Sequence, residues 1–471
     1  MLLRLAPLLL VVAAQAWSQS PAIPDTPAGR QFAAWLALFN RGDRDAYKEF
    51  IDKNYPSDPQ PVDREMAFRE MTGGFDVKQV EPSTADTQAE LLLQGRNSDQ
   101  FARIWVVVEP AEPHRIVDLE IAAVPRPAAF PVPHLSVGDL IAAVRKRLDL
   151  EAAAGRFSGT VLIARNGQSV LAEAYGLSDR EHQTPNRLQT RFRIGSMNKM
   201  FTATATLQLV QAGKLGLNDP LGKYLPDYPN KDVASKVTLY HLLTHTGGTG
   251  DIFGPEFQVH RLELRTLDDY VKLYGNRPLQ FEPGSKWGYS NYGFILLGVV
   301  IEKVSGQSYY DYVRDHIYKP AGMTRTGSEP EDQPVSDRSV GYTSRGGGSE
   351  HPNTETLPYR GTSAGGGYST VEDLLQFANA LEEHRLLNRR YSEMLTMGKV
   401  DLGRGHRYAF GFDDGRIKGI GCFGHGGGAP GMNGELEICP TPGYVVAVLA
   451  NVDPPEADQI SQFITNRLPE R

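Results

Sequence analysis

The chain has 471 residues, a formal net charge of −7 and 40% apolar residues. This composition excludes wholesale disorder, and no nucleic-acid partner is expected of a surface without basic excess. At roughly 150 residues per domain, the length predicts two or three domains. Two cysteines, Cys422 and Cys439, are too few for a disulfide-dense scaffold or a cysteine-rich zinc module.

Residues 1–18 have the pattern of a secretory signal peptide. Arg4 supplies positive charge and Leu5–Ala14 is apolar. Small residues typical of a cleavage site come next and end at Ser18. The alternative is an uncleaved anchor, but an apolar stretch of about ten residues is too short to span a bilayer. We therefore expect an exported protein, periplasmic or secreted, with no stable membrane insertion after the leader is cleaved.

Residues 24–124 predict a small α+β domain. Three helices are expected from Pro27 to Asn40, from Asp43 to Asn54 and from Val62 to Met71, and four strands between Phe75 and Val124. In element order and size this segment resembles domains of the nuclear-transport-factor-2 (NTF2-like) and ketosteroid-isomerase type. Its carboxylates Asp43, Asp45 and Asp63 lie on polar helix faces, so an accessory role is favoured over an isomerase or ligand-binding activity.

A proline-rich linker, residues 125–134, separates this segment from residues 135–471. The second segment opens with a helix from Val137, followed by two strands around Asn166-Gly167, a strong hairpin signal. It ends with a strand, Tyr444–Ala450, and a helix. We expect an antiparallel sheet that is completed by strands from both ends of the segment.

The stretch Ser196-Met-Asn-Lys199 lies where a loop becomes a helix, so that Lys199 is one turn above Ser196 on the same face. A serine hydroxyl becomes nucleophilic when a base removes its proton. A lysine can serve as that base if burial lowers its pKa. Without further motifs, the alternative is a capping serine followed by an exposed lysine.

Two further motifs accompany this stretch. Tyr289-Ser-Asn291 offers a phenol that can relay a proton and an amide that can contact a carbonyl. His425-Gly-Gly-Gly428 combines a residue that titrates near neutrality with glycines that allow close backbone approach. Taken singly, these could be a turn with a half-buried tyrosine and a glycine-rich hairpin.

Together the three motifs resemble the serine β-lactamase and penicillin-binding-protein family, most closely its class C branch with esterase and D-peptidase relatives. The resemblance covers residues 135 to 468, with support from Leu242–Gly248 and Ser363–Thr370. It implies an α+β fold in which helices flank an antiparallel sheet, beside an all-helical subdomain. No cofactor or metal is implied.

The resemblance also implies roles for the motif residues. Ser196 would be the acylated nucleophile, Lys199 and Tyr289 would share general-base and proton-shuttle work without a decision between them, and Asn291 would orient the substrate carbonyl. The backbone N–H groups of Ser196 and Gly428 would form the oxyanion hole, with His425 in place of the cation of the third motif.

The third motif departs from the family pattern because it lacks both the lysine and the hydroxyl residue that face a β-lactam carboxylate. This departure disfavours a dedicated β-lactamase. We expect an exported serine hydrolase, carboxylesterase-like, that acts on a small-molecule ester, amide or peptide. The alternatives are a D-amino-acid peptidase, a weak β-lactamase or penicillin-binding activity, and a non-catalytic ligand-binding protein on the same fold.

Three other features need interpretation. Ser363 lies in a literal G-x-S-x-G, but a suitable strand before it and a helix directly after it are missing, which disfavours it as a nucleophile. His241 and His245 have zinc-ligand spacing without the glutamate of H-E-x-x-H. Cys422 and Cys439 would face each other if the chain turned near Pro430-Gly431, so either a disulfide or two separate thiols is possible.

Overall fold

The computed structural model describes residues 21–56, 60–83, 85–345, 349–403, 405–417 and 419–469. Two compact units are present, Met1–Pro131 and Val132–Arg471, and each has a core of its own. The predicted signal peptide lies outside the described residues. Within the described ranges, no helix is both long and apolar enough to cross a membrane.

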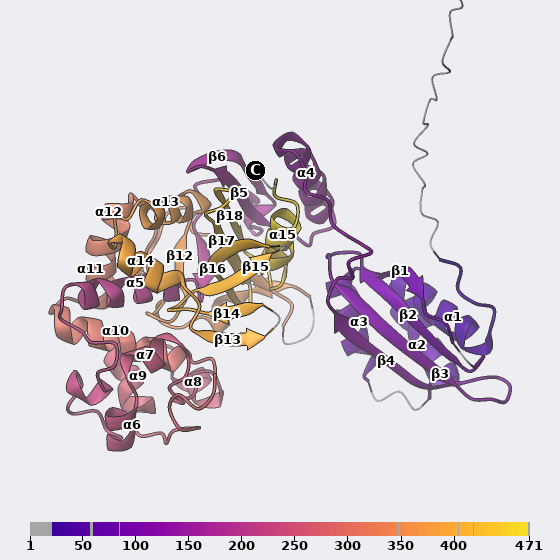
Figure 1. Ribbon diagram of the computed structural model, residues 1–471, viewed down its shortest axis with the longest axis horizontal. Coiled ribbons are helices and arrows are strands. Elements are labelled where there is room, and N and C mark those ends of the chain that lie inside the picture. The colour runs from indigo at the N-terminus through magenta and orange to yellow at the C-terminus, as the bar shows by residue number, and fades with distance from the viewer. Residues whose placement is uncertain are drawn as a thin grey trace, which may run out of the picture. The chain divides into compact units, whose positions relative to one another are not determined.

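In its described residues, the first unit has three helices followed by a four-stranded antiparallel sheet in the order β1-β2-β3-β4 (Figure 1). Thr26 caps α1 by accepting a hydrogen bond from the Gly29 N–H, and Phe32, Trp35 and Phe39 on its apolar face are buried. The elements are α1 (Pro27–Arg41), α2 (Arg44–Asn54), α3 (Val62–Thr72), β1 (Phe75–Val80), β2 (Gln88–Gly95), β3 (Phe101–Val108) and β4 (Ile116–Val124).

The three carboxylates considered in the first unit have structural contacts. Asp43 caps α2 through the Ala46 N–H, and Arg44 forms ion pairs with Asp45 and Asp63. These contacts are at the surface and lend no support to a catalytic role for the unit.

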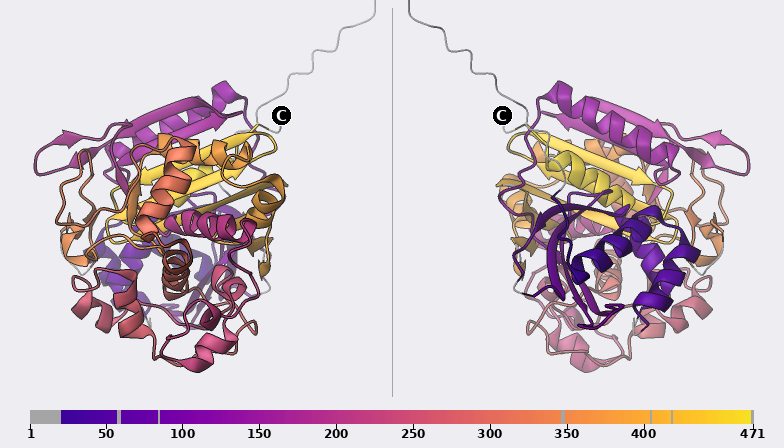
Figure 2. Two further views of the ribbon diagram at one scale, coloured as in Figure 1. Left: turned by 90° about the vertical axis from the view of Figure 1, so that its left-hand side faces the viewer. Right: turned by 90° about the vertical axis from the view of Figure 1, so that its right-hand side faces the viewer.

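An eight-stranded antiparallel sheet forms the centre of the second unit, in the order β13-β14-β15-β16-β17-β18-β5-β6. As predicted, a strand near the start of the unit pairs with one near its end, from Tyr444 opposite Arg165 to Ala450 opposite Gly159. Figure 2 shows these purple and yellow strands side by side. The strands are β13 (Val400–Gly403), β14 (His406–Tyr408), β15 (Asp413–Ile417), β16 (Ile420–Ala429), β17 (Met432–Cys439), β18 (Tyr444–Ala450), β5 (Gly159–Arg165) and β6 (Gln168–Tyr175).

The predicted hairpin between β5 and β6 is confirmed. Asn166 and Gly167 form its two-residue turn with φ values of +49° and +76°. Positive φ at both positions is the geometry that asparagine followed by glycine adopts at low cost and that matches the twist of the strands.

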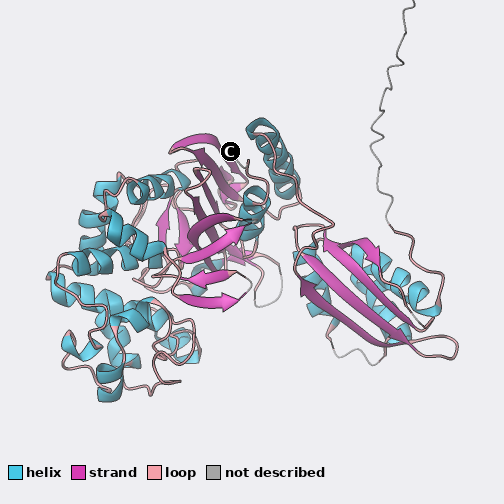
Figure 3. Ribbon diagram, viewed as in Figure 1, coloured by secondary structure: helices cyan, strands magenta, loops and turns pink. Residues whose placement is uncertain are grey.

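Helices cover both faces of this sheet (Figure 3). On one face, α4 (Val137–Ala153) and α15 (Glu456–Thr465) pack on apolar residues of β5, β17 and β18. The other face packs against the larger helical region, which contains α5 (Asn198–Gln211), α10 (Asn291–Ser305) and α13 (Val371–Glu382). The remaining helices are α6 (Lys231–Lys236), α7 (Leu239–Leu243), α8 (Pro255–His260), α9 (Leu267–Tyr274), α11 (Tyr309–Val313), α12 (Lys319–Ala321) and α14 (Arg389–Thr396).

Three small strand pairs complete the second unit: β7 (Leu177–Asp179) with β8 (Thr184–Pro185), β9 (Phe192–Gly195) with β12 (Gly367–Ser369), and β10 (Tyr342–Thr343) with β11 (His351–Pro352). The predicted architecture of this unit, an antiparallel sheet flanked by helices with a helical region beside it, is confirmed.

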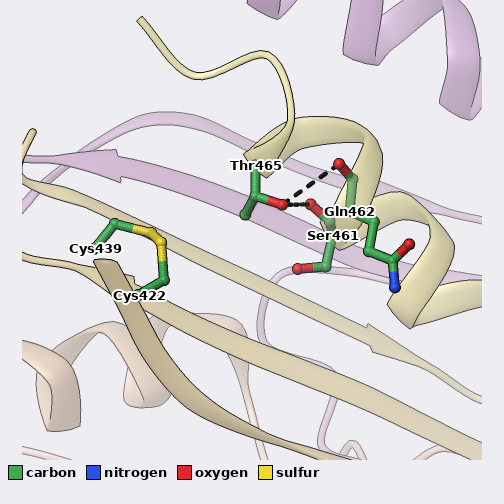
Figure 4. The surroundings of a disulfide bond; sticks show 5 residues. All are labelled: Cys422, Cys439, Ser461, Gln462 and Thr465. Atoms are coloured by element: carbon green, nitrogen blue, oxygen red, sulfur yellow. Dashed lines mark hydrogen bonds between the residues drawn. A yellow bond between two sulfur atoms is a disulfide. The ribbon is translucent and has the colours of Figure 1, made fainter. Parts of the chain in front are cut away.

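The structure decides between the two possibilities for the cysteines. β16 and β17 pair from Phe423 opposite Ile438 to Ala429 opposite Met432, which is the register expected for a turn at Pro430-Gly431. Cys422 and Cys439 form a disulfide. Figure 4 shows this bridge beside α15, whose Ile460 and Ile464 belong to the same buried cluster.

Replacing both cysteines by alanine should lower the free energy of unfolding by about 2–4 kcal/mol, because the bridge closes a loop with a sequence separation of 17 residues. Urea unfolding of the wild type and of the Cys422→Ala/Cys439→Ala variant measures this loss. Reduced and alkylated wild-type protein serves as the control, and its unfolding midpoint should also shift to a lower urea concentration. An unchanged unfolding midpoint in the variant would contradict a stabilising role for the bridge.

Candidate active site

Ser196 lies between β9 and α5, at the wall of a cavity of about 190 Å³. Gly195, the residue before it, has a φ of +48°, and a Cβ at that position would lie 2.9 Å from the backbone nitrogen of Gly428. Glycine is required there because any larger residue would meet the backbone of β16. This close approach sets the position from which the Ser196 hydroxyl faces the cavity.

Lys199 lies in the first turn of α5, three residues after Ser196, and it is completely buried. Its amine donates hydrogen bonds to Asn291 Oδ1 (2.7 Å) and to the backbone oxygen of Ala364 (2.6 Å). Burial lowers the pKa of Lys199 to about 7, against a smaller opposite effect of Asp251. A neutral amine that donates its two N–H groups to these acceptors keeps its lone pair available to a third partner.

Asn291 connects Lys199 to an acidic side chain. Its Nδ2 donates to Asp251 Oδ2 (3.1 Å), and its backbone N–H donates to Asp251 Oδ1 (3.2 Å). Because the carboxylate accepts from the amide nitrogen, Oδ1 of Asn291 must turn toward Lys199. Sequence reasoning did not identify Asp251; its signal was an acidic residue directly after the glycine-rich end of the Leu242–Gly248 stretch.

Tyr289 is close to the buried lysine and to Ser196. Its ring centroid is 4.7 Å from Lys199 Nζ, and the Ser196 side chain is near enough to influence the pKa of its hydroxyl. Burial raises the pKa of Tyr289 well above its ordinary value, although Ser196 acts in the opposite direction. The phenol therefore keeps its proton at neutral pH, whereas the amine of Lys199 can lose one.

The predicted oxyanion donors, Ser196 and Gly428, come from the two backbone segments that touch at Gly195. A Cβ on Gly427 would lie 3.1 Å from the Ser196 nitrogen, so β9 and β16 approach as closely as their backbones allow. Both Ser196 and Gly428 line the cavity. The structure thus brings these backbone groups together beside the Ser196 hydroxyl.

The cavity is mainly apolar. Among the described residues that line it, none is a lysine, arginine or histidine. Its apolar walls are formed by Ile252, Phe253, Phe257, Tyr270, Pro358, Ala364, Ala429, Pro430 and Met432. A larger cavity of about 650 Å³, lined by Arg193, Glu331 and Arg338 among others, contains no residue of the three motifs.

The structure places His425, the expected substitute for the third-motif cation, in a buried position. The residue is 5% exposed and is not among the described residues that line the cavity. Its Nε2 contacts Tyr408 Oη (3.1 Å), and its Nδ1 contacts the backbone oxygen of Gly426 (2.5 Å). Burial lowers the pKa of His425, with an opposing effect of Asp413. These contacts give no support to a charged histidine at a substrate carboxylate, and the third-motif role of His425 stays a prediction.

The remaining candidates lie outside the site. Ser363 is fully buried beneath Gly298 of α10, and its hydroxyl has no hydrogen-bond partner in the described part of the chain. His241 completes the capping box at the start of α7. In the described ranges, no three His, Cys, Asp or Glu side chains are grouped so that they could hold a metal.

Comparisons with known proteins agree with this arrangement. The beta-lactamase family model matches residues 140–468. Esterase EstB of Burkholderia gladioli is 36% identical over 193 residues, which are 37% of this chain and 49% of the relative. The PbpX protein of Bacillus subtilis is 36% identical over 244 residues, 51% of this chain and 59% of the relative. The chain therefore matches about half to three fifths of the length of these curated relatives.

Among solved structures, a D-stereospecific amidohydrolase from Streptomyces has the same fold, with a TM-score of 0.58 and 30% sequence identity. The match covers 69% of this chain and 98% of the amidohydrolase. With a family model that spans more than half of its length, this chain belongs to the beta-lactamase family.

Proposed function

We propose that this protein is a serine hydrolase that cleaves uncharged esters through an acyl-enzyme on Ser196. The observation that carries the proposal is the completely buried amine of Lys199, one turn from Ser196, with a pKa lowered to about 7. About half of such amines are without their proton near pH 7, and the neutral amine can act as a general base.

In the first step, the Ser196 hydroxyl loses its proton toward Lys199 while Oγ attacks the ester carbonyl carbon. The carbonyl oxygen becomes an anion and accepts hydrogen bonds from the backbone N–H groups of Ser196 and Gly428. The carbon–oxygen bond to the alcohol then breaks, and the alcohol leaves with a proton supplied through Tyr289, which Lys199 reprotonates. Water repeats the sequence on the acyl-enzyme and releases the acid.

The proposed substrate preference rests on the cavity and on the burial of His425. The walls are apolar, and none of the described lining residues carries a positive charge. A carboxylate there would lose its hydration without gaining a charged partner, which is costly. We therefore propose esters with uncharged acyl groups, rather than β-lactams, as the preferred substrates. The 30% identity with a D-stereospecific amidohydrolase supports D-amino-acid amides as the second candidate.

Export remains part of the proposal. It rests on the pattern of residues 1–18 and is supported by the bridge between Cys422 and Cys439, because disulfides form and persist mainly in oxidising compartments.

A matched pair of substrates tests the substrate class. p-Nitrophenyl pentanoate and the p-nitrophenyl monoester of glutaric acid have acyl chains of equal length, and only the second ends in a carboxylate. We expect kcat/KM to be about tenfold or more higher for the pentanoate, since an unpaired buried charge costs ~1–3 kcal/mol or more. Equal rates would contradict the proposal. Faster turnover of a D-amino-acid amide or of a chromogenic cephalosporin would favour the alternatives.

A pair of serine variants tests the nucleophile. Ser196→Ala should abolish ester hydrolysis, by about 10³-fold or more, because the acyl-enzyme can no longer form. Ser363→Ala should keep kcat/KM within about twofold, since it removes a buried hydroxyl without a partner. Circular dichroism confirms that both variants are folded. Loss of activity in Ser363→Ala with retention in Ser196→Ala would overturn the assignment.

A further inference from the structure

Three buried side chains form a continuous hydrogen-bonded chain behind the site. His245 follows α7, Tyr408 ends β14, and His425 lies within β16, so the chain joins segments that are far apart in sequence. Their side chains are 1%, 2% and 5% exposed. In the described part of the protein, none of the three lines the cavity that holds Ser196.

With neutral imidazoles, the direction of every hydrogen bond in this chain is determined. The Ser290 backbone N–H donates to Nδ1 of His245 (3.0 Å), so the proton of this imidazole is on Nε2. His245 Nε2 then donates to Tyr408 Oη (3.1 Å), and the Tyr408 hydroxyl donates to Nε2 of His425 (3.1 Å). His425 Nδ1 donates in turn to the backbone oxygen of Gly426 (2.5 Å).

This pattern satisfies all groups only when both imidazoles are neutral. Burial, the largest cause, lowers the pKa of His245 and of His425, and the nearby Lys199 acts in the same direction. An additional proton on His245 would set its Nδ1–H against the Ser290 N–H, and one on His425 would leave the Tyr408 hydroxyl proton without an acceptor within this chain. These hydrogen bonds therefore hold the three side chains in place, and neither imidazole carries an extra proton.

The two ends of the chain hold the two halves of the proposed catalytic site. At one end, His245 binds Ser290, which lies between Tyr289 and Asn291, and its ring centroid is 4.3 Å from that of Tyr289. The backbone oxygen of His245 also accepts from the Gly288 N–H (2.8 Å). At the other end, His425 precedes Gly428 by three residues on β16.

The backbone conformation of His245 indicates that surrounding contacts hold this residue in place. His245 has a φ of +57°, in the left-handed region that residues other than glycine seldom occupy. Such a conformation persists where surrounding contacts determine it, and here those contacts lead to Tyr289 and Tyr408.

We propose that His245 and Tyr408 are positioning residues that, through His425, fix the Tyr289–Asn291 segment relative to the strand that carries the Gly428 N–H. The proposal rests on the proposed function, because it assigns these residues to alignment of the proton-transfer and oxyanion groups. Misalignment of catalytic groups by about 1 Å can cost ~10²-fold in rate. Since none of the three side chains lines the cavity, we expect changes in kcat with little change in KM.

Variants at positions 408 and 425 test this role. Tyr408→Phe removes the central hydroxyl and should lower kcat about tenfold to hundredfold, with KM within about twofold. Glutamine at 425 places an amide near the position of Nε2 and can accept from Tyr408, whereas asparagine places it near Nδ1 and cannot reach Tyr408. His425→Gln should therefore keep kcat within about threefold, and His425→Asn should resemble Tyr408→Phe.

A double variant and a matched control complete the experiment. Tyr408→Phe/His425→Asn should be no slower than either single variant, because both remove the same link. Tyr47→Phe, which removes the buried hydrogen bond from Trp35 in the first unit (2.8 Å), should leave kcat unchanged.

Each outcome decides one question. If the wild type hydrolyses esters and Tyr408→Phe keeps full kcat, the positioning role is overturned while the proposed function stands. If His425→Gln and His425→Asn are equally inactive, His425 acts through its own imidazole and the proposed link is wrong. A wild type without hydrolytic activity would overturn the proposed function itself, and the positioning role with it.

Discussion

The burial of one ammonium group constrains much of this site. Lys199 is fully enclosed, and a charged amine loses several kcal/mol of hydration in such a place unless partners replace the water. Two acceptors come from distant parts of the chain, the Asn291 side chain and the Ala364 backbone. The lowered pKa of Lys199 follows from the same burial. The fold thus assembles three separate segments around one amine and lowers its pKa toward neutrality.

The strand β16 makes contacts on both faces of the sheet, because its side chains point alternately to one face and the other. Cys422 lies on the face covered by α4 and α15, where the disulfide joins β16 to β17. His425, an odd number of residues further on, lies on the opposite face, where it contacts Tyr408. The same strand then reaches Gly428 at the cavity. One face therefore anchors the strand, and the other aligns it with the candidate site.

Local patterns predicted the parts of the fold that depend on local physics. The Asn166-Gly167 turn and the position of Ser196 at the start of a helix follow from short-range spacing, whereas the spacing of Cys422 and Cys439 left open whether they form a bridge. The sequence could not reveal the role of His425, because its partner Tyr408 was not recognisable as one and a neighbouring glycine motif suggested exposure to substrate. Asp251 was missed for the same reason: its contact with Asn291 crosses 40 residues.

The central claim is that Lys199 is neutral in the free protein near physiological pH, and NMR titration of its side chain tests this most directly. Lysine labelled at Cε and Nζ gives one signal per residue, and the signal of Lys199 is the one that Lys199→Met lacks. We predict a midpoint near pH 7, with the charged form below it and the neutral form above it. A midpoint close to the ordinary value of 10.5 would contradict the account.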